Sequence, residues 1–236
     1  EYEKGHKNYE DVKTLYPYYI LHHACKAKCG IDVVKALVEC LRNEHDENFA
    51  TIISDIEWTP LHYAARYIPE YKVISYLLEQ SEKAKLRQDV FNRYPLHLAL
   101  NARNSVDKQV IKLLCCKEAI KEPTMYLSRT PLHIACNRGA SKEIFELLIH
   151  EADEATSGSV KDILTKQTRL KYTPLQLAVE KRLSHEIIKL LIPSFSKGTS
   201  NYSSHPLYTK YNGMIPLAHA CWNRSKADTI NVLLNC

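Results

Sequence analysis

Histidine, a frequent metal ligand and general base, occurs at one position of a repeated string that reads Thr-Pro-Leu-His or a close variant. These histidines are His22, His62, His97 and His133, and a further copy carries Gln176 at the same position. Gln176 favours a structural role, because an amide can hydrogen-bond there as an imidazole does. We therefore expect each side chain to bond the backbone or the threonine hydroxyl at its own helix start, and the next copy. We predict no metal ion at these histidines.

Histidine and cysteine also gather near the start of the chain, as His22, His23, Cys25 and Cys29. Their spacing fits no paired Cys-x-x-Cys scheme of a zinc site, and Cys29 with His22 is no better as a nucleophile with its base. The sequence contains no glycine-rich phosphate loop, no His-Glu-x-x-His and no Gly-x-Ser-x-Gly motif. We therefore predict that the chain is not an enzyme, uses no cofactor and has no small-molecule substrate.

Repeat position, and not pairing, explains four of the eight cysteines. Three of them share one repeat position, which small or aliphatic side chains fill in the other copies: Cys25, Cys136 and Cys221, against Ala65, Leu100 and Val179. A fourth, Cys115, falls where the other copies have an aliphatic residue. A cysteine in such a position is a small core hydrophobe. We expect reduced cysteines and a cytoplasmic protein, with the nucleus as a further location.

Cations recur at the end of the first helical segment of each copy. We take the proline of each string, or Ile20 in a degenerate first copy, as the anchor of that copy. The residues six to eight positions after the anchors read KAK, RYI, NAR, NRG, EKR and WNR. The cations are Lys26, Lys28, Arg66, Arg103, Arg138, Lys181, Arg182 and Arg224, with Glu180 as the one acid and with Tyr67 and Trp222 interleaved. If the copies stack, these residues form a basic stripe on the inner, concave side.

Two interpretations of the basic stripe remain open. Cations at a helix C-terminus complement the helix macrodipole, which is worth about 0.3–1 kcal/mol each and needs no partner. Alternatively, the stripe binds an acidic or phosphorylated segment of a protein, because arginine suits bidentate contacts with oxyanions.

The elements that must position these residues form a repeat. Its anchors are Ile20, Pro60, Pro95, Pro131, Pro174 and Pro216. A leucine follows every anchor by one position and an alanine by four, which places both on one helical face. A second apolar stripe has a leucine 17 positions after the anchor in five copies, and Leu114, two positions later, in the third. Each copy is therefore a helix–turn–helix unit that must stack on its neighbours to bury its apolar side.

The strings TPLHYAA, YPLHLAL, TPLHIAC and TPLQLAV, followed by VISYLL, VIKLLC, IFELLI and IIKLLI, resemble ankyrin repeats. The resemblance covers residues 18–236 and implies an all-α solenoid of six helix–turn–helix units with long β-hairpin fingers. Residues 1–17 are predicted to be a leader or a partial cap. The glycine usual three positions before the proline survives only as Gly213. Because Glu57, Ser128 and Lys171 take a left-handed backbone less easily than glycine, we expect irregular fingers.

The resemblance implies a non-catalytic scaffold that binds a protein partner on its concave face. The net charge of +5 permits an acidic partner, and no apolar run approaches the ~20 residues of a membrane span. A second hypothesis is a targeting or regulatory module of a larger enzyme or channel. It is motivated by Leu233 and Leu234, which would lack a covering neighbour, so we expect the natural chain to continue beyond Cys236. Nucleic-acid binding is a third hypothesis, against which an acidic finger at residues 39–57 argues.

Overall fold

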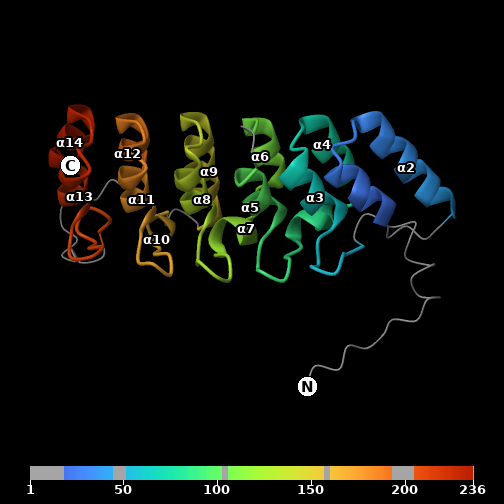
Figure 1. Ribbon diagram of the computed structural model, residues 1–236, viewed down its shortest axis with the longest axis horizontal. Helices are drawn as coiled ribbons and strands as arrows, with labels where there is room; N and C mark the ends of the chain where they lie inside the picture. Colours follow the sequence, from blue (N-terminus) through green and yellow to red (C-terminus); the bar gives the residue numbers. More distant parts are fainter. Residues whose placement is uncertain (1–18, 45–51, 103–105, 157–159, 193–204, 236) are drawn as a thin grey trace, which may run out of the picture.

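The computed structural model describes residues 19–44, 52–102, 106–156, 160–192 and 205–235. Helix pairs stand side by side in one row from the N-terminal to the C-terminal end, and the connecting loops lie along one edge of that row (Figure 1). This arrangement confirms the predicted all-α solenoid of stacked helix–turn–helix units. Residues 1–17, the predicted leader, and Arg103 of the basic stripe lie outside the described residues.

The first helix of each unit after the degenerate one begins at its anchor proline. The first helices are residues 19–26, α3 (Pro60–Tyr67), α5 (Pro95–Leu100), α8 (Pro131–Arg138), α11 (Pro174–Glu180) and α13 (Pro216–Trp222). The residue before each of these prolines has an extended backbone, with φ between −82° and −76°, as a helix N-cap requires. Proline costs nothing at the first helical position, because the N–H that it lacks has no intrahelical acceptor there.

The second helices form the other layer of the array. They are α2 (Ile31–Glu44), α4 (Tyr71–Gln80), α6 (Lys108–Leu114), α9 (Lys142–Ala155), α12 (His185–Leu190) and α14 (Ala227–Leu234). From α3 to α13, each first helix contacts the next first helix, and the second helices contact one another in the same series. Most motif leucines and all the motif alanines, such as Leu61 and Ala64, are buried between the units, and Leu217 of the last unit is half-buried. Leu114 is fully buried in its shifted position. None of the described helices is long and apolar enough to span a lipid bilayer.

The fingers between the units are tight hairpin-like turns. Within the described ranges they contain no strand, and one isolated bridge joins Tyr211 to Met214. In four fingers the N–H of the first residue donates to the carbonyl of a residue four or five positions later, and the side-chain oxygen of that first residue accepts the later N–H in return. The pairs are Ser54 with Trp58, Asp89 with Arg93, Thr124 with Arg129, and Thr168 with Tyr172. Two hydrogen bonds therefore close each of these turns.

Backbone hydrogen bonds also join neighbouring fingers. Three amides donate to a carbonyl four positions before the preceding unit's anchor: Val90 to Ile56 (3.5 Å), Met125 to Phe91 (2.9 Å) and Arg169 to Leu127 (3.0 Å). The fingers are consequently held at a common spacing, and equivalent finger residues form rows along the array.

The units exceed the family period of about 33 residues partly because of short extra helices that follow the second helices. These are the 3₁₀ helix η2 (Glu82–Leu86), α7 (Lys117–Lys121) and α10 (Lys161–Leu164). Each buries at least one apolar side chain, namely Ala84, Ile120 and Leu164. The added residues are therefore part of the packed structure.

For the turns that the structure describes, the expectation of irregular fingers is wrong. Glu57, Asn92, Ser128 and Lys171 all take the left-handed backbone three positions before their anchors, with φ of 58°, 55°, 50° and 67°. The two hydrogen bonds that close each turn hold these residues in a conformation that costs a side-chain-bearing residue about 1–2 kcal/mol. The finger geometry therefore persists where the sequence lacks the favourable residue.

One expectation about the cysteines is also wrong. Cys25 and Cys136 are fully buried as expected, and the Cys136 thiol donates to the Pro174 carbonyl of the next unit at 3.3 Å. Cys221 occupies the same repeat position but is exposed. The position is buried by the following unit and not by its own, and no described residue of a further unit lies over α13.

Glycine should stabilise the fingers at the left-handed positions. We expect Lys171→Gly and Ser128→Gly each to raise the free energy of unfolding by roughly 0.5–1 kcal/mol, since relief of the left-handed strain exceeds the added chain entropy. Asn92→Gly is the matched control and should gain less, because asparagine tolerates this conformation. Urea unfolding followed by circular dichroism measures all three, and a loss of stability in Lys171→Gly would contradict the explanation.

Candidate functional site

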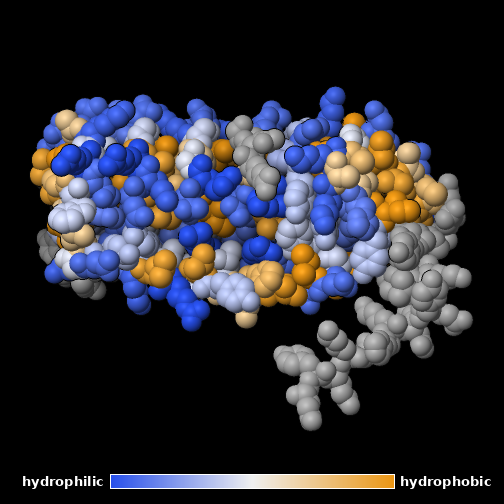
Figure 2. Space-filling model, in the orientation of Figure 1, coloured by the Kyte–Doolittle hydropathy of each residue, from blue (hydrophilic) through white to orange (hydrophobic). Residues whose placement is uncertain are grey.

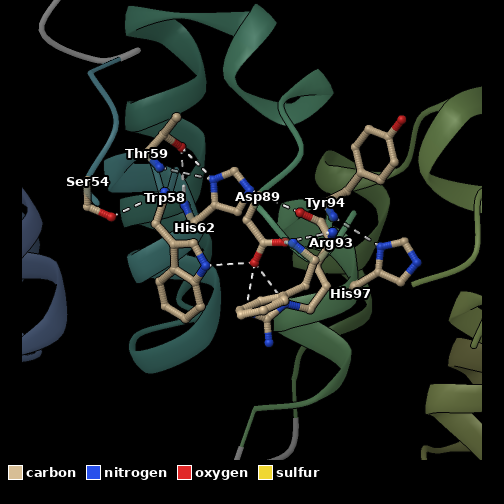
Figure 3. Close-up of polar contacts among 9 residues, drawn as sticks. Ser54, Trp58, Thr59, His62, Asp89, Arg93, Tyr94 and His97 are labelled. Atoms are coloured by element: carbon tan, nitrogen blue, oxygen red, sulfur yellow. Dashed lines mark hydrogen bonds and ion pairs between the residues drawn. The ribbon is translucent and has the colours of Figure 1, made fainter. Parts of the chain in front are cut away.

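The repeated histidine joins each unit to the next. In His62, Nδ1 accepts the backbone N–H of Thr59 at 3.2 Å and lies 2.9 Å from the Thr59 hydroxyl (Figure 3). Its Nε2 donates to the Arg93 carbonyl in the next unit at 3.3 Å. The ring thus bonds its own helix start and the following finger at once, which confirms the predicted structural role.

The same pattern recurs in the other units. His97 accepts from the Tyr94 N–H and donates to the Glu122 carbonyl, both at 3.2 Å. His133 accepts from the Thr130 N–H at 3.2 Å and donates to the Tyr172 carbonyl at 3.0 Å. Gln176 reproduces both bonds with its amide, at 3.0 Å from the Thr173 N–H and 2.7 Å to the Thr209 carbonyl. His22 donates across the first boundary to carbonyls of Ile52 and Trp58, both at 3.0 Å.

These rings are neutral in the folded protein. Burial lowers the pKa of His62, His97 and His133 to about 4 in each case, outweighing the carbonyl hydrogen bonds that favour the charged form. Protonation of Nδ1 would in addition direct an N–H against the backbone N–H that it now accepts. Neutral, fully buried and doubly bonded rings are unsuited to act as ligands or bases.

A buried carboxylate organises the finger of the third unit (Figure 3). Asp89 Oδ2 accepts the Trp58 indole N–H at 2.7 Å and forms an ion pair with Arg93 at 2.7 Å, while Oδ1 accepts the N–H groups of Phe91 and Arg93. Burial alone would raise the pKa of Asp89, but these hydrogen bonds hold that pKa below its usual value. The charge of Arg93 is therefore compensated inside the protein.

A groove lies where the fingers meet the first helices of the third, fourth and fifth units. It consists of a cavity of about 320 Å³ over α5 and α8 and a second of about 200 Å³ over α8 and α11. Leu127, Arg129 and Asn137 line both cavities, so the two adjoin. We refer to both together as the groove.

The groove is lined by residues at four positions of the repeat. Two of these positions precede the anchor, by four residues and by two residues, and the other two follow it, by three residues and by six residues. In the third to fifth units these residues are Phe91, Arg93, Leu98 and Asn101; Leu127, Arg129, Ile134 and Asn137; and Leu170, Tyr172, Leu177 and Glu180. The first three positions were not singled out from the sequence. The signal that could have found them is the cation or aromatic residue that recurs two positions before the anchors.

The polar groups of the groove differ in whether they are compensated. Arg129 is half-buried, and within the described part of the chain its guanidinium has no hydrogen-bond or ion-pair partner. One carboxylate oxygen of Glu180, Oε2, is buried and accepts no hydrogen bond from any described residue. Burial and the neighbouring Glu180 and Tyr211 raise the pKa of Tyr172, whose ring stacks on Tyr211 at 3.7 Å.

Three arginines of the basic stripe bond the backbone of adjacent units. Arg66 donates to the Asn101 carbonyl, Arg138 to the Ala102 carbonyl at 2.6 Å, and Arg182 to the Asn223 carbonyl at 2.7 Å. Arg66 and Arg138 approach the C-terminal end of α5 from opposite neighbours. One of the two interpretations of the stripe was that its cations complement the helix dipole. These arginines do so, but each one contacts carbonyls at the end of a neighbouring helix and not of its own.

The remaining stripe residues are placed differently. Lys181 is exposed and lines the smaller cavity of the groove. Lys26, Lys28 and Arg224 are exposed, and so is Trp222, at 77%. Tyr67 is half-buried against Trp58 and Tyr63. The groove therefore brings together one predicted cation with several residues that sequence reasoning missed.

The described residues contain no group of three or more His, Cys, Asp or Glu side chains that could hold a metal ion. Their seven cysteines are all free thiols. Within this part of the chain, the groove combines an unsatisfied polar atom, Glu180 Oε2, with space for a ligand.

Comparison with known proteins gives one family and one fold. A model of ankyrin repeats, built on three copies, matches residues 4–89 and 70–157, which together exceed half of the chain. The crystal structure of an ankyrin repeat domain from Acinetobacter baumannii superposes with a TM-score of 0.63 at 18% sequence identity, covering 92% of this chain and 97% of that one. No curated protein matches the sequence.

The neutral histidines predict a stability that depends on pH. Their folded pKa of about 4 lies below the unfolded value of 6.5, so their contribution is complete above pH 6.5 and is lost as the pH falls toward 4. We expect each histidine to remove roughly 1 kcal/mol of unfolding free energy by pH 5.5 and roughly 2 kcal/mol by pH 5. Urea midpoints measured from pH 7.5 to pH 5 test this.

Gln176 suggests the control for the pH dependence. In the triple variant His62→Gln, His97→Gln and His133→Gln, each amide can form both hydrogen bonds but does not titrate. This variant should remain folded, and its urea midpoint should change much less between pH 7.5 and pH 5. An unchanged pH dependence in the triple variant would contradict the assignment.

The cross-unit arginines predict a separate effect on stability. Arg138→Met should lower the free energy of unfolding by about 1 kcal/mol, because the partly buried, charge-assisted hydrogen bond to the Ala102 carbonyl is lost. Arg224→Met is the matched control and should change it by less than about 0.5 kcal/mol, since the Arg224 side chain has no bond to a described residue. Equal effects in thermal unfolding would contradict the role given to Arg138.

Proposed function

The chain belongs to the ankyrin repeat family, and we propose from this that it is a non-catalytic module that binds an acidic or phosphorylated segment of a protein partner on the face formed by its first helices and fingers. Ankyrin repeats generally mediate protein–protein interaction and are typically non-catalytic. The observation that carries the proposal is the groove. There, Arg129 is half-buried, has no hydrogen-bond or ion-pair partner among the described residues, and lines both a cavity with aromatic and aliphatic walls and a more polar one.

The electrostatics of this face support an anionic partner. Lys181 lies in the groove, and Lys26 and Arg224 extend the positive charge toward the two ends of the array. Glu180 is the one acid among the stripe positions. Positive charge distributed along a face attracts an anionic segment from a distance and orients it on approach.

A reducing compartment, the cytoplasm or the nucleus, is part of the proposal. Cys25, Cys115 and Cys136 are packed as hydrophobic side chains, and burial raises the pKa of each thiol. Such thiols react slowly, and their positions serve packing instead of pairing.

Charge reversal tests the proposal. Partners captured on the immobilised chain from an extract of its native source should be lost, by at least tenfold, from the variant Lys26→Glu, Lys181→Glu and Arg224→Glu. They should also elute as salt is raised, because exposed charges are screened. The matched control reverses three exposed lysines of the second helices, Lys72→Glu, Lys112→Glu and Lys189→Glu, and should capture normally.

Two results would contradict the proposal. One is capture that the charge reversal on the first-helix face leaves unchanged. The other is comparable binding of duplex DNA or RNA at low salt, which would make the nucleic acid the partner.

A further inference from the structure

We propose that the groove binds an extended protein segment that presents one oxyanion to Arg129 and one bulky apolar side chain to the larger cavity. The oxyanion is a carboxylate or a phosphate, since both accept the paired N–H groups of a guanidinium. The inference rests on the proposed function, and it names the residues that recognise the partner.

The comparison of two equivalent arginines carries the argument. Arg93 and Arg129 each lie two positions before an anchor, and the backbone N–H of each is accepted by the side chain that opens its finger, at 2.8 Å from Asp89 and 3.2 Å from Thr124. Asp89 also binds the Arg93 guanidinium, through Nε and Nη2 at 2.7 Å. Thr124 accepts the equivalent backbone N–H but carries no charge. Two fingers with the same closing bonds thus hold one neutralised and one uncompensated arginine.

The surroundings of Arg129 fit an apolar side chain beside an oxyanion. The larger cavity of about 320 Å³ is walled by Phe91, Tyr126, Leu127 and Ile134. Tyr126 is 61% exposed and lies 5.4 Å from the Phe91 ring. Aromatic walls at the edge of a cavity are typical anchor points for a side chain of a binding partner.

Glu180 supplies a complementary group at the other end of the groove. Its buried Oε2 lacks a donor among the described residues, and leaving a buried acceptor unsatisfied is unfavourable. An extended segment exposes a backbone N–H toward the same side at every second residue. A segment whose oxyanion contacts Arg129 can therefore direct an N–H to Glu180.

The recessed position of these groups favours a peptide over a membrane surface. Hydrophobic side chains gather along the edge of the array formed by the fingers, around α7 (Figure 2). Among the exposed apolar residues, Met125, Tyr126, Leu127 and Leu170 belong to these fingers. However, Arg129 and Asn137 line cavities behind that edge, where a narrow chain reaches and a flat bilayer does not.

The substitution Thr124→Asp tests the proposal at the residue that opens the fourth finger, which also lines the larger cavity, and it leaves Arg129 in place. By analogy with Asp89, it should pair with Arg129 from inside and neutralise it. Thr124→Asn is the matched control, because its amide oxygen can close the finger without a charge. Arg129→Gln provides the reciprocal loss of charge. Urea unfolding of each variant confirms that the comparison is made between folded proteins.

The probe is a displayed library of random linear 12-residue peptides selected on the immobilised wild-type chain. We expect enriched sequences to place an Asp or Glu within a few residues of a bulky apolar residue. Their affinity should fall at least tenfold in Thr124→Asp and in Arg129→Gln, and should stay within about twofold of wild type in Thr124→Asn. Synthetic versions of the best peptide, with phosphoserine or serine replacing the acid, identify which oxyanion is preferred and should lose binding only with serine.

Three results would overturn the inference. They are enriched peptides without an acid, a Thr124→Asp variant that binds them like wild type, and failure to enrich any peptide; sedimentation with phosphatidylserine vesicles in the last case would make a membrane the ligand. The proposed function has its own separate test, because capture of a native partner that depends on Lys26, Lys181 and Arg224 can succeed on this face even if Arg129 does not contact the partner.

Discussion

The hydrogen bond from a buried imidazole or amide of one unit to a finger carbonyl of the next is the interaction on which the remaining structure depends. Each unit has an apolar side that it cannot bury alone, so units must stack, but apolar contact by itself is non-directional. The cross-unit bonds of His62, His97, His133 and Gln176 are directional, and the side chains that donate them are buried. They set each finger at a defined place over the preceding helix start, and this placement creates the groove.

The same register explains why three arginines of the basic stripe bond backbone carbonyls of neighbouring units. Once the first helices lie side by side, the carbonyls at the end of one helix are within reach of long side chains on the adjacent ones. Arg66 and Arg138 meet at the short helix α5, which ends at Leu100 and leaves the Asn101 and Ala102 carbonyls open. The stripe is thus partly a set of links between units. Among its described residues, the cations without such a link are Lys181 and those toward the ends of the array.

A repeat protein acquires a specific site where its copies differ. The backbone of the third and fourth fingers is closed by equivalent bonds, yet Asp89 neutralises Arg93 while Thr124 leaves Arg129 uncompensated. In the same way, Glu180 stands where the neighbouring units have Asn101 and Asn137. Common positions provide the shape of the groove, and the departures from the repeat provide its chemistry.

The recurrence of leucine and alanine after each anchor was sufficient to predict the helix pairs, their order and their stacking. The apolar pattern of both helices repeats with each anchor along the chain, and each pair has an apolar side that only a neighbouring pair can cover. The structural role of the histidines followed from Gln176 in the same way. Spacing could not reveal that Glu57, Ser128 and Lys171 would take the left-handed backbone, since closing hydrogen bonds overrode their local preference. Nor could it show that Arg138 bonds a neighbour while Arg129 lacks a partner: both are cations in phase with the repeat, and the difference lies in contacts between residues far apart in the chain, which exist only after the units have packed together.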